Sequence, residues 1–458
     1  MKRHQLKNLE TWLQGSDRKP LIIRGARQVG KSTLVRIFAE QLQRPLLDVN
    51  LERFPQLSSV FESMDPTLIL NQIEALPRSK AATKDSIFFL DEIQAVPKAI
   101  PALRYFYEDS NTPPVIAAGS LLEFVLSNHQ FSMPVGRVQY LHMGPMTFTE
   151  YLEALEENKL KSEIESFVPG VQIGPVVHRR LLELLRGYYF VGGMPEAVAA
   201  FARNRKFSDV RPIHNSIMET YREDFPKYSG SRNLTRMLRV LNFAARNVGI
   251  KIKYSNISQE DQAATIKQDI DLLCMARVIA KVVHSHASGL PLQADLEERS
   301  FKLLFLDIGL MNAICGLGWS AISNLSDEQL VNEGAVAEQF VGQHLMALFA
   351  DSLNRELTYW LREGKANNAE VDYLAAFDGR IVPIEVKAGS RGSLRSLHQF
   401  AGEKRISLAV RFDINLPSTQ TVETTIRTGG HATDVKYQLA SLPLYLVERL
   451  PALIRLHP

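Results

Sequence analysis

The residues best suited to chemistry form a loop near the N-terminus that combines two glycines with a lysine and two hydroxyl side chains. The segment matches the pattern G-x-x-x-x-G-K-[ST], and it lies between the apolar run 21–23 and an apolar pattern with helical spacing. Glycine allows the backbone to wrap around phosphate, and the free N–H groups of a helix N-terminus attract anions. We expect Lys31 to reach the β- and γ-phosphates of a bound ATP and Ser32 to bind Mg²⁺. The expected nucleotide-binding residues of this loop are Gly25, Ala26, Arg27, Gln28, Val29, Gly30, Lys31, Ser32 and Thr33.

Two carboxylates, Asp91 and Glu92, directly follow the apolar run 87–90. A continuous apolar run is typical of a central parallel strand that is buried on both faces, and the C-terminal end of such a strand lies beside the phosphate loop. Asp91 would then complete the Mg²⁺ site within the nucleotide-binding set, and Glu92 would act as the general base that polarises the attacking water. Strand-like runs at 45–51, 115–120 and 138–143 predict an α/β domain around this pair.

The composition is that of a globular chain with several domains. The 458 residues are 45% apolar and 22% charged, an ordinary balance in a chain too long for one core. No apolar run approaches the roughly 18 uninterrupted residues that a membrane span needs, so we expect a cytoplasmic protein without a membrane partner. The two cysteines, Cys274 and Cys315, exclude a disulfide framework and a cysteine zinc site. A net charge of +3 is too small to indicate nucleic-acid binding by itself.

Five short motifs together resemble one group of ATPases. They are Gly-Ala-Arg-Gln-Val-Gly-Lys-Ser in the loop, Leu-Asp-Glu-Ile-Gln at 90–94, Ala-Gly-Ser-Leu-Leu-Glu at 118–123, Pro-Val-Gly-Arg-Val at 134–138 and Gly-Gly-Met-Pro-Glu at 192–196. The set is similar to the bacterial and archaeal AAA+-type ATPases that carry a C-terminal domain of unknown function 4143, and the similarity covers nearly the whole chain. This resemblance implies ATP and Mg²⁺ as cofactors, hydrolysis of ATP to ADP and phosphate, and a ring-forming homo-oligomer, for which we expect a hexamer.

The same resemblance implies roles for two further side chains. Ser120 follows a strand at the position where such ATPases place a sensor of the γ-phosphate, and the alternative is a helix N-cap. Arg137 is the candidate for an arginine finger that reaches into the site of a neighbouring subunit, and the alternative is a structural ion pair. Both residues belong with Glu92 in the predicted catalytic set.

The central part of the chain combines a basic surface with the pattern of a DNA-binding motif. Residues 231–259 lack Asp and Glu, and they contain Arg232, Arg236, Arg239, Arg246, Lys251 and Lys253. The helical spacing of the arginines places them on one face, opposite an apolar face. An expected helix at 263–273 and a strand at 276–283 complete the order of a winged helix-turn-helix. We therefore expect DNA as a partner, recognised by structure rather than by sequence; the alternatives are a winged helix that docks a protein and a plain three-helix bundle.

The last third contains a second set of carboxylates. Glu338 is expected on a helix, Asp372 on a strand, and Glu385 and Lys387 two apart on the next strand, where they share a face. In this order the residues resemble the PD-(D/E)xK nuclease core. Glu338, Asp372 and Glu385 could then bind Mg²⁺ or Mn²⁺, and Lys387 could orient the attacking water as a catalytic residue. No Pro-Asp pair precedes the second strand, Glu370 competes with Asp372 for the metal position, and an ion pair on an edge strand is the alternative.

The predicted architecture is an α/β chain of four parts. An AAA+ P-loop domain with a parallel sheet at 1–165 precedes a helical connector at 166–230, a winged helix-turn-helix at 231–300 and an α/β PD-(D/E)xK nuclease-like domain at 301–458. The first hypothesis is an ATP-hydrolysing motor that binds and remodels DNA, with metal-dependent nuclease activity as a further expectation. The second hypothesis is a nucleotide-controlled switch or scaffold, whose degenerate nuclease fold docks a protein partner.

Overall fold

The computed structural model describes residues 1–77, 81–120, 122–127, 134–229, 234–324, 334–352, 356–363, 368–387, 394–428 and 431–456. The chain forms two compact units. The N-terminal unit is Met1–Gly144 together with Met275–Arg277, and the C-terminal unit is Pro145–Cys274 together with Val278–Pro458. Within the described ranges, every helix is too short or too polar to span a bilayer.

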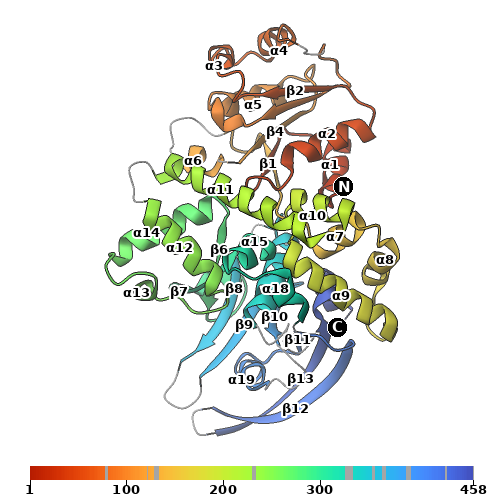
Figure 1. Ribbon diagram of the computed structural model, residues 1–458, viewed down its shortest axis with the longest axis vertical. Coiled ribbons are helices and arrows are strands. Elements are labelled where there is room, and N and C mark those ends of the chain that lie inside the picture. The colour runs from red at the N-terminus through yellow and green to blue at the C-terminus, as the bar shows by residue number, and fades with distance from the viewer. Residues whose placement is uncertain are drawn as a thin grey trace. The chain divides into compact units, whose positions relative to one another are not determined.

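The N-terminal unit is built on a five-stranded parallel sheet with the strand order β2-β3-β4-β1-β5. Figure 1 labels β1, β2 and β4 of this sheet. Its strands are β1 (Leu21–Arg24), β2 (Leu46–Asn50), β3 (Ile87–Asp91), β4 (Val115–Gly119) and β5 (Gln139–His142). Its helices are α1 (Gln5–Gln14), α2 (Lys31–Gln41), α3 (Leu57–Phe61), α4 (Pro66–Glu74), η1 (Ile93–Ala95), α5 (Ala99–Glu108) and α6 (Leu122–Ser127). Because β4 lies between β1 and β3, the segments that follow these three strands meet at one edge of the sheet. The predicted α/β class is confirmed for this unit.

Two of the three inner strands, β3 and β4, are buried along their whole length. Phe88 and Leu90 of β3 pack in one cluster with Phe61 of α3, Ile69 of α4 and Leu103 of α5. Each such side chain contributes about 1.5–3 kcal/mol when it is fully buried. This apolar packing fixes the strand that carries Asp91 and Glu92 at its end.

The C-terminal unit combines helices with an eight-stranded mixed sheet of order β12-β13-β11-β10-β9-β8-β6-β7. Its strands are β6 (Ile279–Ser285), β7 (Leu296–Phe305), β8 (Leu357–Arg362), β9 (Ala369–Phe377), β10 (Arg380–Val386), β11 (Leu408–Asp413), β12 (Ser418–Thr428) and β13 (His431–Pro443). Its helices are α7 (Phe148–Ala154), α8 (Asn158–Ser166), α9 (Pro175–Val191), α10 (Pro195–Asn204), η2 (Phe207–Asp209), α11 (Val210–Ser229), α12 (Leu234–Arg246), α13 (Tyr254–Ile257), α14 (Ala263–Met275), η3 (Leu292–Asp295), α15 (Ile308–Ile314), α16 (Trp319–Asn324), α18 (Gly334–Leu348), α19 (Arg395–Lys404), η4 (Leu444–Arg449) and α20 (Leu450–Arg455).

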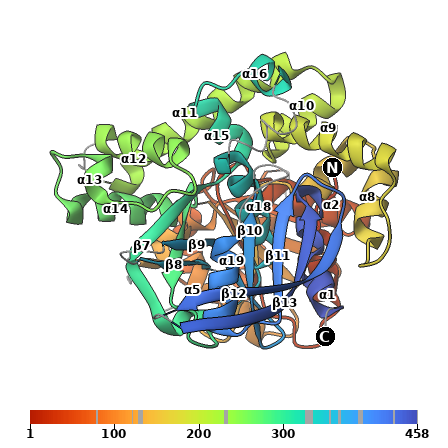
Figure 2. The same cartoon turned by 90° about the horizontal axis from the view of Figure 1, so that it is seen from below.

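The β6–β7 hairpin belongs to the same sheet as the strands of the expected nuclease-like domain. β6 pairs antiparallel with β7 on one side and parallel with β8 on the other. The expected boundary at residue 300 therefore falls inside β7. Figures 1 and 2 show α12, α13 and α14 grouped at the β7 end of this sheet. Three helices and a hairpin follow one another here, and both the winged helix and its contact with DNA stay predictions.

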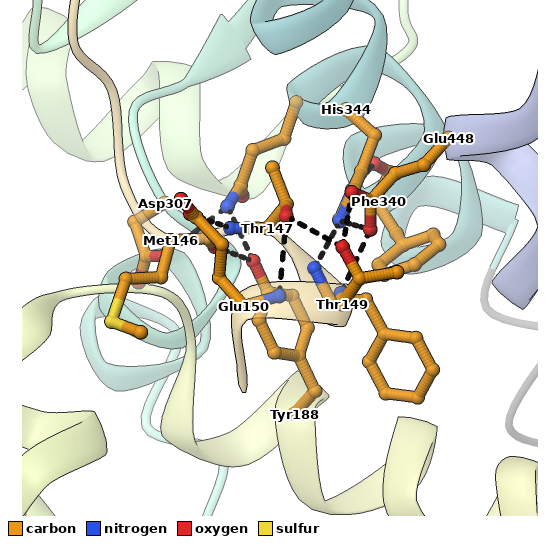
Figure 3. Close-up of polar contacts among 11 residues, drawn as sticks. Met146, Thr147, Thr149, Glu150, Tyr188, Asp307, Phe340, His344 and Glu448 are labelled. Atoms are coloured by element: carbon orange, nitrogen blue, oxygen red, sulfur yellow. Dashed lines mark hydrogen bonds and ion pairs between the residues drawn. The ribbon is translucent and has the colours of Figure 1, made fainter. Parts of the chain in front are cut away.

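A buried carboxylate connects several segments of the C-terminal unit (Figure 3). Asp307 accepts hydrogen bonds from the backbone N–H groups of Gly193 at 2.6 Å and Leu310 at 3.1 Å. The amide of Gln343 donates to Asp307 at 3.4 Å and to the hydroxyl of Tyr188 at 3.0 Å. Burial raises the pKa of the Asp307 carboxyl to about 6, and the hydrogen bonds oppose that rise. The carboxylate thus links the segment after α9 to α15 and α18.

Candidate functional site

The phosphate loop connects β1 to α2, and its backbone geometry requires glycine at positions 25 and 30. Gly30 caps α2 with the left-handed angle φ = 93°. A Cβ atom at Gly25 would lie 2.1 Å from the carbonyl oxygen of Met143, which leaves no room for a side chain. The loop is also braced by Arg3, whose guanidinium donates to the carbonyl oxygen of Val29 at 2.7 Å. No pattern in the sequence pointed to Arg3.

Lys31 folds back over the loop that precedes it. Its Nζ donates to the carbonyl oxygens of Gly25 at 3.0 Å and Ala26 at 2.7 Å, and only 8% of the residue is exposed. Burial lowers the pKa of Lys31 to about 8, although Glu92 and Asp91 counteract this effect. The ammonium group is therefore held inside the curve of the loop. Its positive charge is only partly balanced there, and a bound phosphate would supply the missing negative charge.

Ser32 and Asp91 come together from α2 and the end of β3. The hydroxyl of Ser32 donates to Oδ1 of Asp91 at 2.9 Å, and Arg36 lies 3.6 Å from the other carboxylate oxygen. Burial raises the pKa of the Asp91 carboxyl above its ordinary value, and the Ser32 hydrogen bond opposes that shift. A hydroxyl and a carboxylate oxygen side by side are hard ligands of the kind that Mg²⁺ accepts together with phosphate oxygens. The residues present therefore fit the Mg²⁺ ion that the ATPase resemblance implies.

Glu92 lies one residue further and is held by two polar side chains. Its backbone has the left-handed angle φ = 51°. Its Oε2 accepts from the amide of Gln94 at 2.6 Å and from the hydroxyl of Ser120, at the end of β4, at 3.3 Å. The strand order explains this contact, because β4 is the neighbour of β3. The sequence predicted Ser120 at this edge but did not assign a role to Gln94. The alternative role of Ser120 as an N-cap depends on Leu121, which lies outside the described residues.

Arg137 lies away from the phosphate loop of its own chain. It precedes β5, whose first residue pairs with Leu21 at the start of β1, whereas the loop follows the end of β1. Its guanidinium is 3.5 Å from Glu108 and lies over the ring of Tyr107 at 5.5 Å. The ion-pair alternative thus describes the contacts within one chain, and the finger role stays a prediction.

Two arginines near the nucleotide site, Arg24 and Arg277, share one carboxylate, and the sequence did not predict this contact. Glu123 of α6 accepts from Arg24 at 2.8 Å and from Arg277 at 2.9 Å. Arg277 belongs to the N-terminal unit although it follows α14 in the chain. Its charge also contributes to the lowered pKa of Lys31, after burial as the main cause.

The C-terminal carboxylates surround a lysine that no pattern in the sequence indicated. Lys302 of β7 has a side chain that is 1% exposed, and its Nζ lies 3.0 Å from Glu338, 2.5 Å from Glu370 and 3.8 Å from Asp372. Burial alone would lower the pKa of Lys302, but the carboxylates raise it above its ordinary value. Burial raises the pKa of the Glu338 carboxyl to about 7. Lys302 thus supplies the positive charge at the centre of this cluster.

Glu385 and Lys387 share a face of β10 and its extension, as their spacing predicted. They form a close ion pair, and Oε2 of Glu385 is buried without a hydrogen-bond partner among the described residues. Burial, followed by repulsion from Asp372, raises the pKa of Glu385 to about 8. Asp372 itself accepts from the backbone N–H of Val386 at 2.7 Å. Two lysines therefore face four carboxylates, and burial favours the neutral forms of Glu338 and Glu385.

In this arrangement the carboxylates do not form a ready metal site. Among the described residues, Glu338, Asp372 and Glu385 do not bring three ligand atoms within 4.8 Å of one another. The Lys302 ammonium lies between Glu338 and Asp372 instead. Binding of Mg²⁺ or Mn²⁺ by Glu338, Asp372 and Glu385 stays a prediction, and no reaction step is derived from it.

The predicted basic surface is partly neutralised by acidic neighbours. Arg236 pairs closely with Asp269, a fully buried residue of α14, and Arg239 lies 3.0 Å from Asp261. Lys251 pairs with Glu363 at 2.5 Å. Arg246, Lys253 and Lys267 are exposed, whereas Arg232 lies outside the described residues. Spacing alone could not reveal the pairs, because the partners come from other segments.

Three family models match consecutive parts of the chain. Residues 17–152 match the AAA domain, residues 182–321 match a domain of unknown function (DUF8612), and residues 333–424 match a domain of unknown function (DUF4143). The chain thus contains an AAA domain and, toward its C-terminus, a DUF4143 domain, as the sequence resemblance indicated. No curated protein matches the sequence.

Solved structures give only weak overall similarity. The Aeropyrum pernix ORC1 protein in complex with DNA is 16% identical, with 69% of this chain and 93% of that chain covered and a TM-score of 0.29. The Aeropyrum pernix ORC2 protein is 11% identical, with coverage of 70% and 96% and a TM-score of 0.34. The Thermotoga maritima RuvB Holliday junction branch migration motor is 14% identical, with coverage of 61% and 89% and a TM-score of 0.28. These values are too low to support an inference about this chain.

Replacement of the buried lysine tests the charge balance of the carboxylate cluster. Lys302→Met should lower the free energy of unfolding by about 3–5 kcal/mol, because buried carboxylates lose their compensating charge. Urea unfolding measures the loss. Lys436→Met is the matched control: Lys436 pairs with Glu423 on the surface, where both side chains are about 70% exposed, and a change within about 0.5 kcal/mol is expected. A Lys302→Met variant as stable as the parent would contradict this account.

Proposed function

We propose that the N-terminal unit binds ATP with Mg²⁺ and hydrolyses it at the edge formed by β1, β4 and β3. The observation that carries this proposal is the convergence beside the phosphate loop of Ser32 from α2 on Asp91 at the end of β3, and of Ser120 after β4 on the adjacent Glu92. The loop amides and Lys31 would bind the β- and γ-phosphates, because the ammonium already lies inside the loop.

Each residue of this site has a distinct task in the proposed reaction. Ser32 and Asp91 would hold Mg²⁺, which neutralises charge on the phosphates when it is bound. Glu92 would accept a proton from the attacking water, and Gln94 would restrain the Glu92 carboxylate until a nucleotide is present. Ser120 would respond to the γ-phosphate, because its hydroxyl contacts the base from the neighbouring strand.

Two substitutions separate ATP binding from hydrolysis. Lys31→Ala should lose most of the affinity for ATP, whereas Glu92→Gln should bind ATP and hydrolyse it at least about a hundredfold more slowly, because only the base is removed. Fluorescent-nucleotide binding and phosphate release measure the two properties. Glu62→Gln is the control, since Glu62 is exposed and pairs only with Lys98 at 3.8 Å among the contacts described. Hydrolysis at the parental rate in Glu92→Gln would refute the assignment of the base.

The complete site is proposed to form between subunits of a ring, with a hexamer as the expected assembly. Arg137 is exposed to 44% and lies at the sheet end opposite its own loop, which supports action on a neighbour rather than on its own nucleotide. The guanidinium would then leave Glu108 and Tyr107 and stabilise charge on the transferred phosphate.

Mixing two inactive variants tests this arrangement. Arg137→Ala and Lys31→Ala proteins should each hydrolyse ATP poorly, and their mixture should recover part of the activity, because some hybrid interfaces contain both intact groups. Phosphate release after verified subunit exchange is the measurement. Arg104→Ala, which removes an exposed partner of Glu108, is the control and should keep parental activity. A mixture that gains nothing despite exchange would contradict the finger.

We further propose that hydrolysis drives the binding and remodelling of DNA through α12–α14, and that the DNA is selected by structure. Support comes from Arg246, Lys253 and Lys267, which are exposed in a segment with the order of a winged helix. As an extension of this proposal, Lys387 and the neighbouring carboxylates would form a nuclease site that cleaves the bound DNA.

The second candidate is a nucleotide-controlled scaffold that docks a protein through the C-terminal unit. Two observations favour it: Arg236 is committed to the buried Asp269, and Lys302 fills the centre of the carboxylate cluster. Basic side chains that form ion pairs within the domain are not available to bind the phosphates of DNA.

Salt titration of DNA binding distinguishes the two candidates. If about four phosphates are contacted, affinity for a labelled branched duplex should fall roughly a hundredfold between 50 and 200 mM salt. Arg246→Glu with Lys253→Glu should weaken binding, and Lys436→Glu should leave it unchanged. Absence of binding even at low salt would favour the scaffold. Cleavage by the parent with Mg²⁺ or Mn²⁺, lost in Asp372→Asn with Glu385→Gln, would support the nuclease extension.

A further inference from the structure

We infer that the β6–β7 hairpin binds a late first-row divalent metal ion, with Zn²⁺ as the preferred ion, through His284, His286 and Glu297. Each residue offers a ligand atom, and these atoms all lie within 4.8 Å of one another. The site lies outside the nucleotide-binding loop and the carboxylate cluster, and it does not depend on the proposed ATPase activity.

The local fold brings the three side chains together. His284 and His286 are two apart at the end of β6, so they face the same side, and their rings meet at a centroid distance of 4.7 Å. Glu297 of β7 pairs with His284 across the hairpin, and its Oε2 lies 3.4 Å from Nδ1 of His284. Asp295 stabilises the connection, since it accepts from Ser285 and from the backbone of Ser288, each at 2.8 Å.

The buried ring of His284 has one nitrogen beside Glu297 and one without a hydrogen-bond partner among the described residues. His284 is 4% exposed, and its Nε2 is buried without a hydrogen-bond partner among the described residues. Buried polar atoms are normally paired, so an imidazole nitrogen in this state calls for an explanation. A neutral imidazole binds a metal ion through the lone pair of either ring nitrogen, and the 3.4 Å separation from Glu297 places Nδ1 of His284 in the cluster.

The donor set selects the class of metal. Imidazole nitrogens favour Zn²⁺ and its late neighbours, whereas Mg²⁺ and Ca²⁺ favour oxygen ligands alone. His286 and Glu297 are exposed, so a bound ion would have three protein ligands and a position open to water. Tyr359 of β8 contacts the His284 ring at 5.6 Å and lies under Lys302 at 5.1 Å. The site therefore adjoins the carboxylate cluster through one aromatic ring.

Metal binding by the full chain tests the inference. Tag-free protein is stripped with a chelator, titrated with Zn²⁺ in excess Mg²⁺ without nucleotide, and measured by competition with a chromophoric chelator. We expect one Zn²⁺ per chain. Affinity should fall at least about tenfold in His286→Ala and in Glu297→Gln, because each removes a ligand. Both residues are exposed, so both variants should keep the parental far-UV spectrum.

Glu298→Gln is the matched control, because Glu298 is exposed and adjacent on β7 but is not one of the three clustered residues. It should bind Zn²⁺ as the parent does. Co²⁺ gives a second readout: its visible absorption should show a ligand field in the parent that is altered in His286→Ala. Failure of the parent to retain Zn²⁺, or equal affinity in parent, His286→Ala and Glu297→Gln, would overturn the inference.

Discussion

The C-terminal unit depends on a carboxylate that has been removed from water and must be satisfied by the chain itself. Asp307 receives backbone N–H groups from two segments more than a hundred residues apart, at Gly193 and Leu310. A Cβ atom at Gly192 would lie 2.1 Å from Oδ1 of Asp307, and one at Gly193 would lie 2.1 Å from the carbonyl oxygen of Met146. The Gly-Gly pair of the sequence motif is therefore explained by close packing around a buried anion.

The same network reaches the start of α7 (Figure 3). Nε2 of His344 accepts from the backbone N–H of Phe148 at 2.9 Å, and Glu448 accepts from the backbone N–H of Thr149 at 2.8 Å. These groups are the donors that a helix N-terminus leaves without partners. These side chains from distant segments add to the local capping box of Thr147 and Glu150, so the position of α7 depends on the completed unit.

The sequence predicted those features whose determinants are local. The loop at 25–33, the strand before Asp91 and the pair Glu385 and Lys387 follow from short-range spacing, and the structure has the corresponding elements. The side chains that complete each site come from elsewhere: Gln94 restrains Glu92, and Lys302 enters the carboxylate cluster from β7. Spacing could not indicate Lys302, because its burial depends on a sheet assembled from distant strands. The pairing of Arg236 with Asp269 was hidden for the same reason.

The parallel pairing of β6 with β8 has a consequence for synthesis of the chain. Val282 pairs with Leu357, about 75 residues later. At the usual rate of about 5–20 residues per second, a ribosome needs about 4–15 s to make the intervening segment. During that interval β6 has β7 on one side and a free edge on the other, which is a surface that pairs readily with foreign strands. The sheet can be completed only after most of the chain has been made, so this unit folds late in translation. Until then chaperones have time to bind the exposed edge of β6.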